Sequence, residues 1–157
     1  MTAHVAHGLK IASNTVNVPE GMLSGAVRWL KNYQERQTAL LEQGDKFRKL
    51  EQLPDGPEKK DALRKLGNYR LTASATDTLV YSVLAECGVK NLPMERYLFR
   101  DRLELPVISQ IQLAEILLDA HRMDDFNKVM PVISQFLQQD DSLQTAWLRL
   151  PNAGYWW

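Results

Sequence analysis

Two histidines near the start of the chain have a spacing that suits a metal ion. His4 and His7 are three residues apart, so a helix would place both imidazoles on one face. A zinc site needs further ligands, and no third ligand stands nearby in the sequence. We therefore expect surface histidines on a first helix and no metal site.

The single cysteine, Cys87, excludes an internal disulfide. A nucleophilic thiolate needs a basic neighbour or a helix N-terminus to lower its pKa. Cys87 instead lies in the last turn of a predicted helix, at the end of its apolar stripe. The negative end of the helix dipole lies there and raises the pKa of a thiol. We expect a small core residue. One cysteine fits either a reducing compartment or a cysteine-poor segment of a secreted protein.

Acidic residues in pairs are candidates for acid and base catalysis of the kind that α/α-toroid glycosidases perform. The pairs are Asp101 with Glu104, Asp124 with Asp125, and Asp140 with Asp141. Asp124 and Asp140 stand where a helix start and a loop use carboxylates for capping. The run from Arg100 to Arg102, with Glu104, is typical of a charged surface. We expect no catalytic pair; an enzyme, a toroid-type glycosidase or lyase, would be built around Asp101 and Glu104.

Other signatures of chemistry are absent from the sequence. It has no glycine-rich phosphate loop, no Gly-x-Ser-x-Gly and no His-Glu-x-x-His. Lys plus Arg and Asp plus Glu number 19 each, which removes the positive field that nucleic-acid binding requires. No stretch approaches the ~18 apolar residues of a membrane span, and the first residues lack the pattern of a secretion signal. We expect no catalytic residue, no cofactor and no nucleic-acid partner.

Helices position these residues in the first half of the chain. Apolar residues at three-to-four spacing predict a helix from Pro19 towards Leu41, with a break at residues 43–45. Residues 54–57, Pro-Asp-Gly-Pro, predict a loop. The charged segment 58–64 then predicts a short helix on a solvated face.

The pattern is clearer from Thr72 onward. A stripe over residues 76–87 predicts a helix that Gly88 closes as its C′ residue. Asn91 is the expected cap of the next helix, whose inward residues are Leu98 and Phe99. Further helices are predicted from Leu105-Pro106, with a stripe from Val107 to Leu118, and from Asp124-Asp125, where Pro131 should kink the helix or shift its start.

The sequence pattern changes after residue 141. Residues 145–150 are β-prone and nearly alternate. We expect a short β-hairpin at the C-terminal end, completed by Tyr155-Trp156-Trp157 around a turn at residues 151–154. The aromatic ending also indicates a piece of a longer polypeptide, because termini are usually polar and frayed.

A succession of helices separated by tight breaks is typical of stacked antiparallel hairpins, as in an α-solenoid or an α/α toroid. At 157 residues the chain has the length of one ordinary domain. The tetratricopeptide and ankyrin signatures are absent. We predict one all-α domain over residues 1–157.

Several stretches, taken in order, resemble the helical, complement-like thioester domain of bacterial alpha-2-macroglobulin proteins. The matching residues are Pro19, Gly25-Ala26, Trp29-Leu30, Tyr33, Ala75, Tyr81, Leu84-Ala85, Gly88, Tyr97-Leu98, Arg100-Asp101-Arg102, Leu105, Leu113-Ala114, Thr145-Ala146-Trp147-Leu148, Leu150-Pro151 and Tyr155-Trp156-Trp157. The likeness spans most of the chain and is weak over residues 46–70.

The resemblance implies an arc of an α/α toroid within a secreted, periplasmic or cell-surface protein that traps proteases. In that family a Cys-x-Glu-Gln motif forms a thioester, but the cysteine here reads Cys87-Gly88-Val89-Lys90. No thioester residue is therefore carried over, and the motif either lies upstream in the parent or is missing from it. The implied partners are the other domains of the parent chain and, through them, target proteases.

The leading hypothesis is thus a non-catalytic structural part of an endopeptidase inhibitor. The alternative is a stand-alone α-solenoid scaffold that binds a protein or peptide in its groove. Because an arc leaves apolar helix faces uncovered, we also expect the isolated chain to associate with itself.

Overall fold

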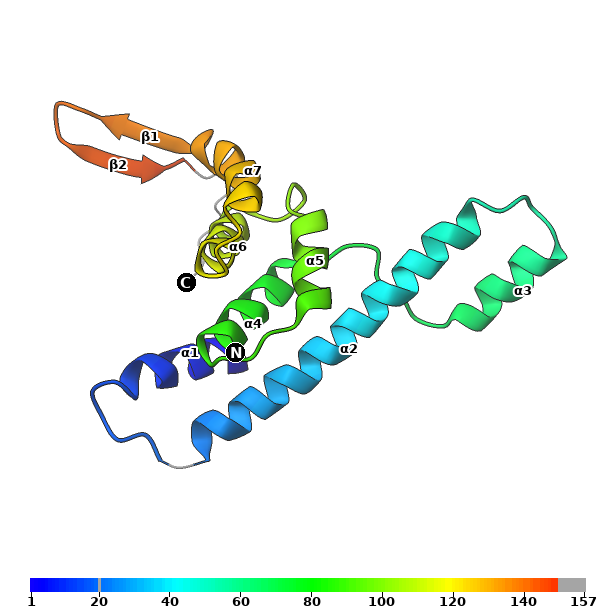
Figure 1. Cartoon of the computed structure of the whole chain (residues 1–157), viewed down its shortest axis with the longest axis horizontal. Coiled ribbons are helices and arrows are strands. Elements are labelled where there is room, and N and C mark those ends of the chain that lie inside the picture. Colours follow the sequence, from blue (N-terminus) through cyan, green and yellow to red (C-terminus); the bar gives the residue numbers. More distant parts are fainter. Residues whose placement is uncertain (20, 150–157) are drawn as a thin grey trace. The chain divides into compact units, whose positions relative to one another are not determined.

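The structure is a computed structural model that describes residues 1–19 and 21–149. In this described part the chain forms seven helices followed by a two-stranded antiparallel sheet (Figure 1). The predicted all-α fold with a short β-hairpin near its C-terminal end is confirmed. The residues group into two compact units, Met1–Asp101 and the residues from Arg102 onward, and each is described by itself. The single domain over residues 1–157 stays a prediction.

A long helix organises the first unit. Helix α2 (Met22–Glu51) has 30 residues and is therefore about 45 Å long. Helices α1 (Thr2–Ala12), α4 (Ala75–Glu86) and α5 (Leu92–Arg100) pack along it, and α3 (Pro57–Leu66) folds back against its C-terminal half (Figure 1). None of the described helices is long and apolar enough to cross a membrane.

The core of this unit lies between α1, α2 and α4. Its buried residues are Ala3, Ala6, Leu30, Val80, Val83 and Leu84. The small alanine side chains bring the backbone of α1 close to its neighbours. Leu41 of α2 is fully buried, as are Met94 and Leu98 of α5, and burial of each such side chain stabilises the fold by ~1.5–3 kcal/mol.

The predicted break at residues 43–45 is wrong, because α2 continues through it to Glu51. Gly44 is buried where the backbone of the segment between α3 and α4 crosses the helix. A Cβ atom at Gly44 would lie 1.9 Å from the carbonyl oxygen of Arg70, and the Arg70 N–H donates to the carbonyl of Leu40 at 3.0 Å. This glycine permits a close approach rather than ending a helix.

The other helix limits in this unit follow the sequence. The segment 54–56 is a loop, and α3 has no buried residue, as expected of a solvated helix. Helix α4 ends with Gly88 at φ 77°, which is the left-handed C′ residue that was predicted. Asn91 caps α5 by accepting a hydrogen bond from the Met94 N–H at 3.0 Å. Leu98 is fully buried and Phe99 partly so.

The second unit contains a helical hairpin. Helices α6 (Val107–Asp119) and α7 (Met123–Ser134) pack against each other. The predicted stripe of α6 is only partly buried, because Leu117 is fully buried whereas Ile108 and Leu118 are exposed. The start of α7 is not shifted by Pro131, which lies inside the helix near its end.

The β-hairpin of the second unit pairs β1 (Leu137–Asp140) with β2 (Thr145–Leu148) in antiparallel register. The strand predicted over residues 145–150 is found over Thr145–Leu148, and its described partner is the segment that follows α7. Tyr155-Trp156-Trp157, the predicted partner strand, lies outside the described residues. The turn is held by Asp140, whose Oδ1 accepts hydrogen bonds from Ser142 Oγ and from the N–H groups of Ser142 and Leu143.

Candidate functional site

The two histidines lie on α1, as predicted. His4 is exposed, whereas Nδ1 of His7 lies 2.8 Å from Oε2 of Glu86 on α4. This contact joins the first and fourth helices at a half-exposed position. Across residues 1–19 and 21–149, no three His, Cys, Asp or Glu side chains are grouped so that they could hold a metal ion.

Asp101 is not part of a charged surface, and that prediction is wrong. Only 5% of the residue is exposed, and its Oδ2 accepts a hydrogen bond of 2.7 Å from the backbone N–H of Ala73. Arg100 donates to both carboxylate oxygens, at 2.7 and 2.9 Å. Glu104 is exposed. Asp101 is therefore a buried carboxylate that holds the start of α4 through one backbone donor and two charge-assisted hydrogen bonds from Arg100.

Arg100 connects three parts of the first unit. Besides pairing with Asp101, its Nη1 donates to Asp45 of α2 at 2.6 Å, and its Nη2 donates to the carbonyl of Leu71 at 2.8 Å. The guanidinium carbon lies 4.7 Å from the centre of the Tyr97 ring. Tyr97 in turn donates its hydroxyl to Asp45 at 2.9 Å.

Arg70 makes a second set of contacts around the segment between α3 and α4. It pairs with both oxygens of Asp77, at 3.2 and 2.7 Å, and donates to Gln37 of α2 at 2.6 Å. The side chain of Asp77 is fully buried and also accepts from the N–H and Oγ of Ser74, which completes a capping box at the start of α4. We call Arg70, Asp77, Asp45, Arg100 and Asp101 the arginine cluster.

The arginine cluster is built to hold backbone segments together. Hydrogen bonding to Asp77 and to Asp101 raises the pKa of Arg70 and of Arg100, respectively. Burial, together with the hydrogen bond to Asp45, raises the pKa of Tyr97 to about 12. The two cations and the phenol therefore keep their protons at neutral pH, and their hydrogen bonds join α2, α4 and α5.

The sequence analysis missed most of these residues. A local signal existed for Ser74 and Asp77, because Ser-x-x-Asp before an apolar run is the pattern of a capping box. No local signal exists for Arg70, whose partner Gln37 is distant in sequence. The same holds for Tyr81 and Glu95, a buried pair joined by a hydrogen bond of 2.5 Å between α4 and α5.

The remaining acidic candidates have structural roles. Asp125 lies in the first turn of α7 and accepts from Arg122 and from Lys128. Hydrogen bonding to Arg122 lowers its pKa. Hydrogen bonds from Ser142 and Leu143 likewise lower the pKa of Asp140 in the hairpin turn. Asp124 is exposed beside Asp125 at the start of the helix.

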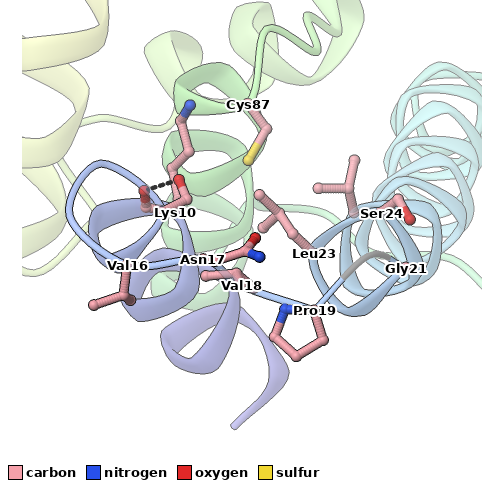
Figure 2. Close-up of a pocket in the computed structure, with 11 residues that line it drawn as sticks. Lys10, Val16, Asn17, Val18, Pro19, Gly21, Leu23, Ser24 and Cys87 are labelled. Atoms are coloured by element: carbon pink, nitrogen blue, oxygen red, sulfur yellow. Dashed lines mark hydrogen bonds between the residues drawn. The ribbon is translucent and has the colours of Figure 1, made fainter.

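A groove lies between the end of α1 and the beginning of α2, with Cys87 in its wall (Figure 2). Its volume is about 640 Å³. Five apolar side chains line it, namely Val16, Val18, Pro19, Leu23 and Val27, together with Lys10 from the last turn of α1. We call this the α1–α2 groove.

Cys87 is therefore not the core residue that was predicted, because it is only partly buried and lines this groove. The expected direction of the thiol pKa shift is confirmed, whereas the helix dipole is not among its causes. Burial raises the pKa most, Lys10 lowers it and Glu86 raises it. A thiol with a raised pKa is a poor nucleophile at neutral pH.

No protein-family model, no curated protein and no solved structure matches this chain. The resemblance to alpha-2-macroglobulin proteins consequently rests on the residues that carry it.

Proposed function

We propose that the chain is a structural, non-catalytic part of a bacterial alpha-2-macroglobulin-like endopeptidase inhibitor, in the helical domain of that protein. The observation that carries the proposal is where the residues of the resemblance lie. Many of them are buried packing residues: Leu30, Tyr81, Leu84, Leu98, Asp101, Leu105, Leu113 and Ala114. Residues with this placement are used for building a helical wall.

The arginine cluster supports the same proposal. Arg100 and Asp101, which belong to the resemblance, form ion pairs and backbone hydrogen bonds that join α2, α5 and the start of α4. Their polar groups are engaged in holding helices together rather than directed at a substrate.

The genomic sequence on both sides of the segment tests the proposal directly. An open reading frame that continues and encodes a bait segment or an upstream Cys-x-Glu-Gln motif supports it. A stop codon directly after the codon for Trp157, with no such motif upstream, overturns it. For a continuing frame, the purified parent should block a protease from large substrates and leave its cleavage of a small peptide ester intact.

Self-association of the isolated chain is a second expectation of this proposal. In the first unit Val5 is 52% exposed, Trp29 50% and Leu92 59%. Apolar side chains on the surface of a part are covered in the whole protein and favour association when the part stands alone. Light scattering of the isolated chain should show a mass that increases with concentration. A strict monomer at high concentration contradicts the expectation.

One observation favours the alternative of a stand-alone helical scaffold, and it is the α1–α2 groove. A scaffold of that kind needs a concave surface for a partner. If the gene ends at Trp157 and a specific partner is recovered, the scaffold takes precedence.

A further inference from the structure

The α1–α2 groove has the size and lining of a site for a small part of a partner. Its volume of about 640 Å³ falls within the ~300–1,000 Å³ range of ligand pockets. Val16 and Val18 line it from the segment after α1, and Leu23 and Val27 line it from α2 (Figure 2). Val16 is 58% exposed. An occupant would thus remove apolar surface from water.

The described residues that line the groove carry a positive charge and no negative one. Lys10 is the only one of them that carries a full charge at neutral pH. Its ammonium makes no hydrogen bond or ion pair with any described residue, although its backbone carbonyl accepts from Ser13 Oγ at 2.6 Å. Lys10 and Cys87 line the same groove, and the charge of Lys10 lowers the pKa of the thiol.

Two polar side chains of the lining are available for hydrogen bonds. Asn17 points into the groove (Figure 2) and Ser24 lines it from α2, and neither takes part in a side-chain hydrogen bond with described residues. An amide that donates and accepts can pair with a peptide backbone in the way that another peptide group does. Apolar walls with interspersed backbone-pairing groups suit an extended peptide better than a hydrocarbon chain, which cannot form hydrogen bonds.

We propose that the α1–α2 groove binds an extended peptide segment in which one carboxylate side chain stands between apolar residues. The carboxylate pairs with Lys10, the apolar neighbours contact the apolar side chains of the lining, and the peptide backbone meets Asn17 and Ser24. The inference goes beyond the structural role proposed above and does not depend on it, because the groove is formed entirely within the first unit.

Cys87 provides the measurement, since it is the only cysteine and lines the groove. The full chain is treated with iodoacetamide, and the rate of Cys87 alkylation is followed by mass spectrometry. The probe is the peptide acetyl-Ser-Val-Glu-Leu-Ser-amide, and its counterpart with Gln in place of Glu is the matched control. We expect the Glu peptide at millimolar concentration to slow alkylation and to shift amide resonances of residues around 10–27 and 87.

Two variants separate the contribution of Lys10 from that of charge in general. Lys10→Gln should weaken binding of the Glu peptide about two- to fivefold, as expected for loss of one partly exposed ion pair, and leave the Gln peptide unaffected. Lys31→Gln removes the same charge from an exposed site of α2 outside the groove and should change neither affinity. Circular dichroism establishes that both variants keep the helical fold.

Three results of these measurements would overturn the proposal or a part of it. Alkylation and resonances that do not respond to either peptide overturn the proposal. Equal binding of both peptides by the chain and by its Lys10→Gln variant overturns the role of the carboxylate. Protection of Cys87 that grows with protein concentration in the absence of peptide means that a second copy occupies the groove, which also overturns it.

Discussion

Gly44 is the residue at which the long helix α2 and the segment between α3 and α4 approach most closely. Because the missing side chain leaves room for the Arg70 carbonyl, the Arg70 side chain can reach Asp77 while its backbone N–H bonds to Leu40. One glycine thereby fixes the place where the arginine cluster assembles.

Replacing Gly44 with alanine should destabilise the chain by about 3 kcal/mol, because the new methyl group overlaps a backbone oxygen that cannot move without breaking the cluster. Gly25→Ala in the same helix is the matched control. It meets no atom within 4 Å and should stabilise the helix by ~0.5–1 kcal/mol. Urea unfolding followed by circular dichroism measures both. Equal effects of the two substitutions would refute the close-approach role.

Tyr97 offers a pH-dependent test of the cluster. Its pKa in the folded chain is about 12, above the ordinary value of about 10, so folding favours the protonated phenol. The stabilisation is complete below pH 10 and is lost as the pH rises towards 12. We expect the urea midpoint to fall between these values, and to fall less in Tyr97→Phe, which has no phenol to ionise. A parallel fall in both proteins would show that other groups cause the alkaline loss.

At the level of elements, the C-terminal ends of α4 and α6 can be compared. Helices α4 and α6 end with the same pair of hydrogen bonds. In α4 the N–H groups of Gly88 and Val89 donate to Ala85 and Leu84, and the N–H groups of His121 and Arg122 donate to Leu118 and Leu117 in α6. Both C′ residues have positive φ, 77° for Gly88 and 57° for His121. Only the second carries a Cβ atom in this conformation.

This difference predicts opposite effects of two substitutions. Gly88→Ala should cost about 1 kcal/mol, because a side chain in the left-handed region is strained. His121→Gly should stabilise by ~0.5–1 kcal/mol, because it relieves that strain. Thermal unfolding of the two variants measures the effects. Destabilisation by His121→Gly would mean that the imidazole makes a contact worth more than the strain.

The sequence was sufficient for elements whose signals are local. Helix limits at Gly88 and Asn91 and the loop at residues 54–56 follow from caps and turn residues, and all three are found. Gly44 was misread because a glycine within a helix can mark either an end or a close contact, and the partner that decides between them, Arg70, is remote in sequence. Asp101 was misread for the same reason: its burial depends on Ala73 and on Arg100, and a run of charges alone resembles a solvated surface.

The same distinction between local signals and contacts remote in sequence applies to the candidate site. The exposure of His4 could be anticipated from its position in the helix, whereas the raised pKa of Cys87 depends mainly on burial that the sequence does not show. The α1–α2 groove could not, because it is formed where the end of α1, the start of α2 and the end of α4 meet. Only packing brings Lys10 and Cys87 to one wall.

At the scale of the whole molecule, the residues of the first unit form a core of their own. Buried apolar side chains on α1, α2, α4 and α5 form this core, and the arginine cluster closes the connection between α3 and α4 entirely within Met1–Asp101. A unit that has its own core and its own polar joints has what independent folding requires.

A chain shortened to residues 1–101 should therefore fold alone. We expect a helical circular dichroism spectrum and a cooperative thermal transition, with a lower midpoint than that of the full chain because a smaller unit buries a smaller fraction of its surface. Asp77→Ala in the shortened chain is the internal control. It removes the buried partner of Arg70 and should cost ~3–5 kcal/mol, whereas Asp61→Ala at an exposed ion pair should change stability by less than ~1 kcal/mol. A broad, non-cooperative transition, or equal responses to the two alanines, would mean that the first unit depends on residues beyond 101 for its packing.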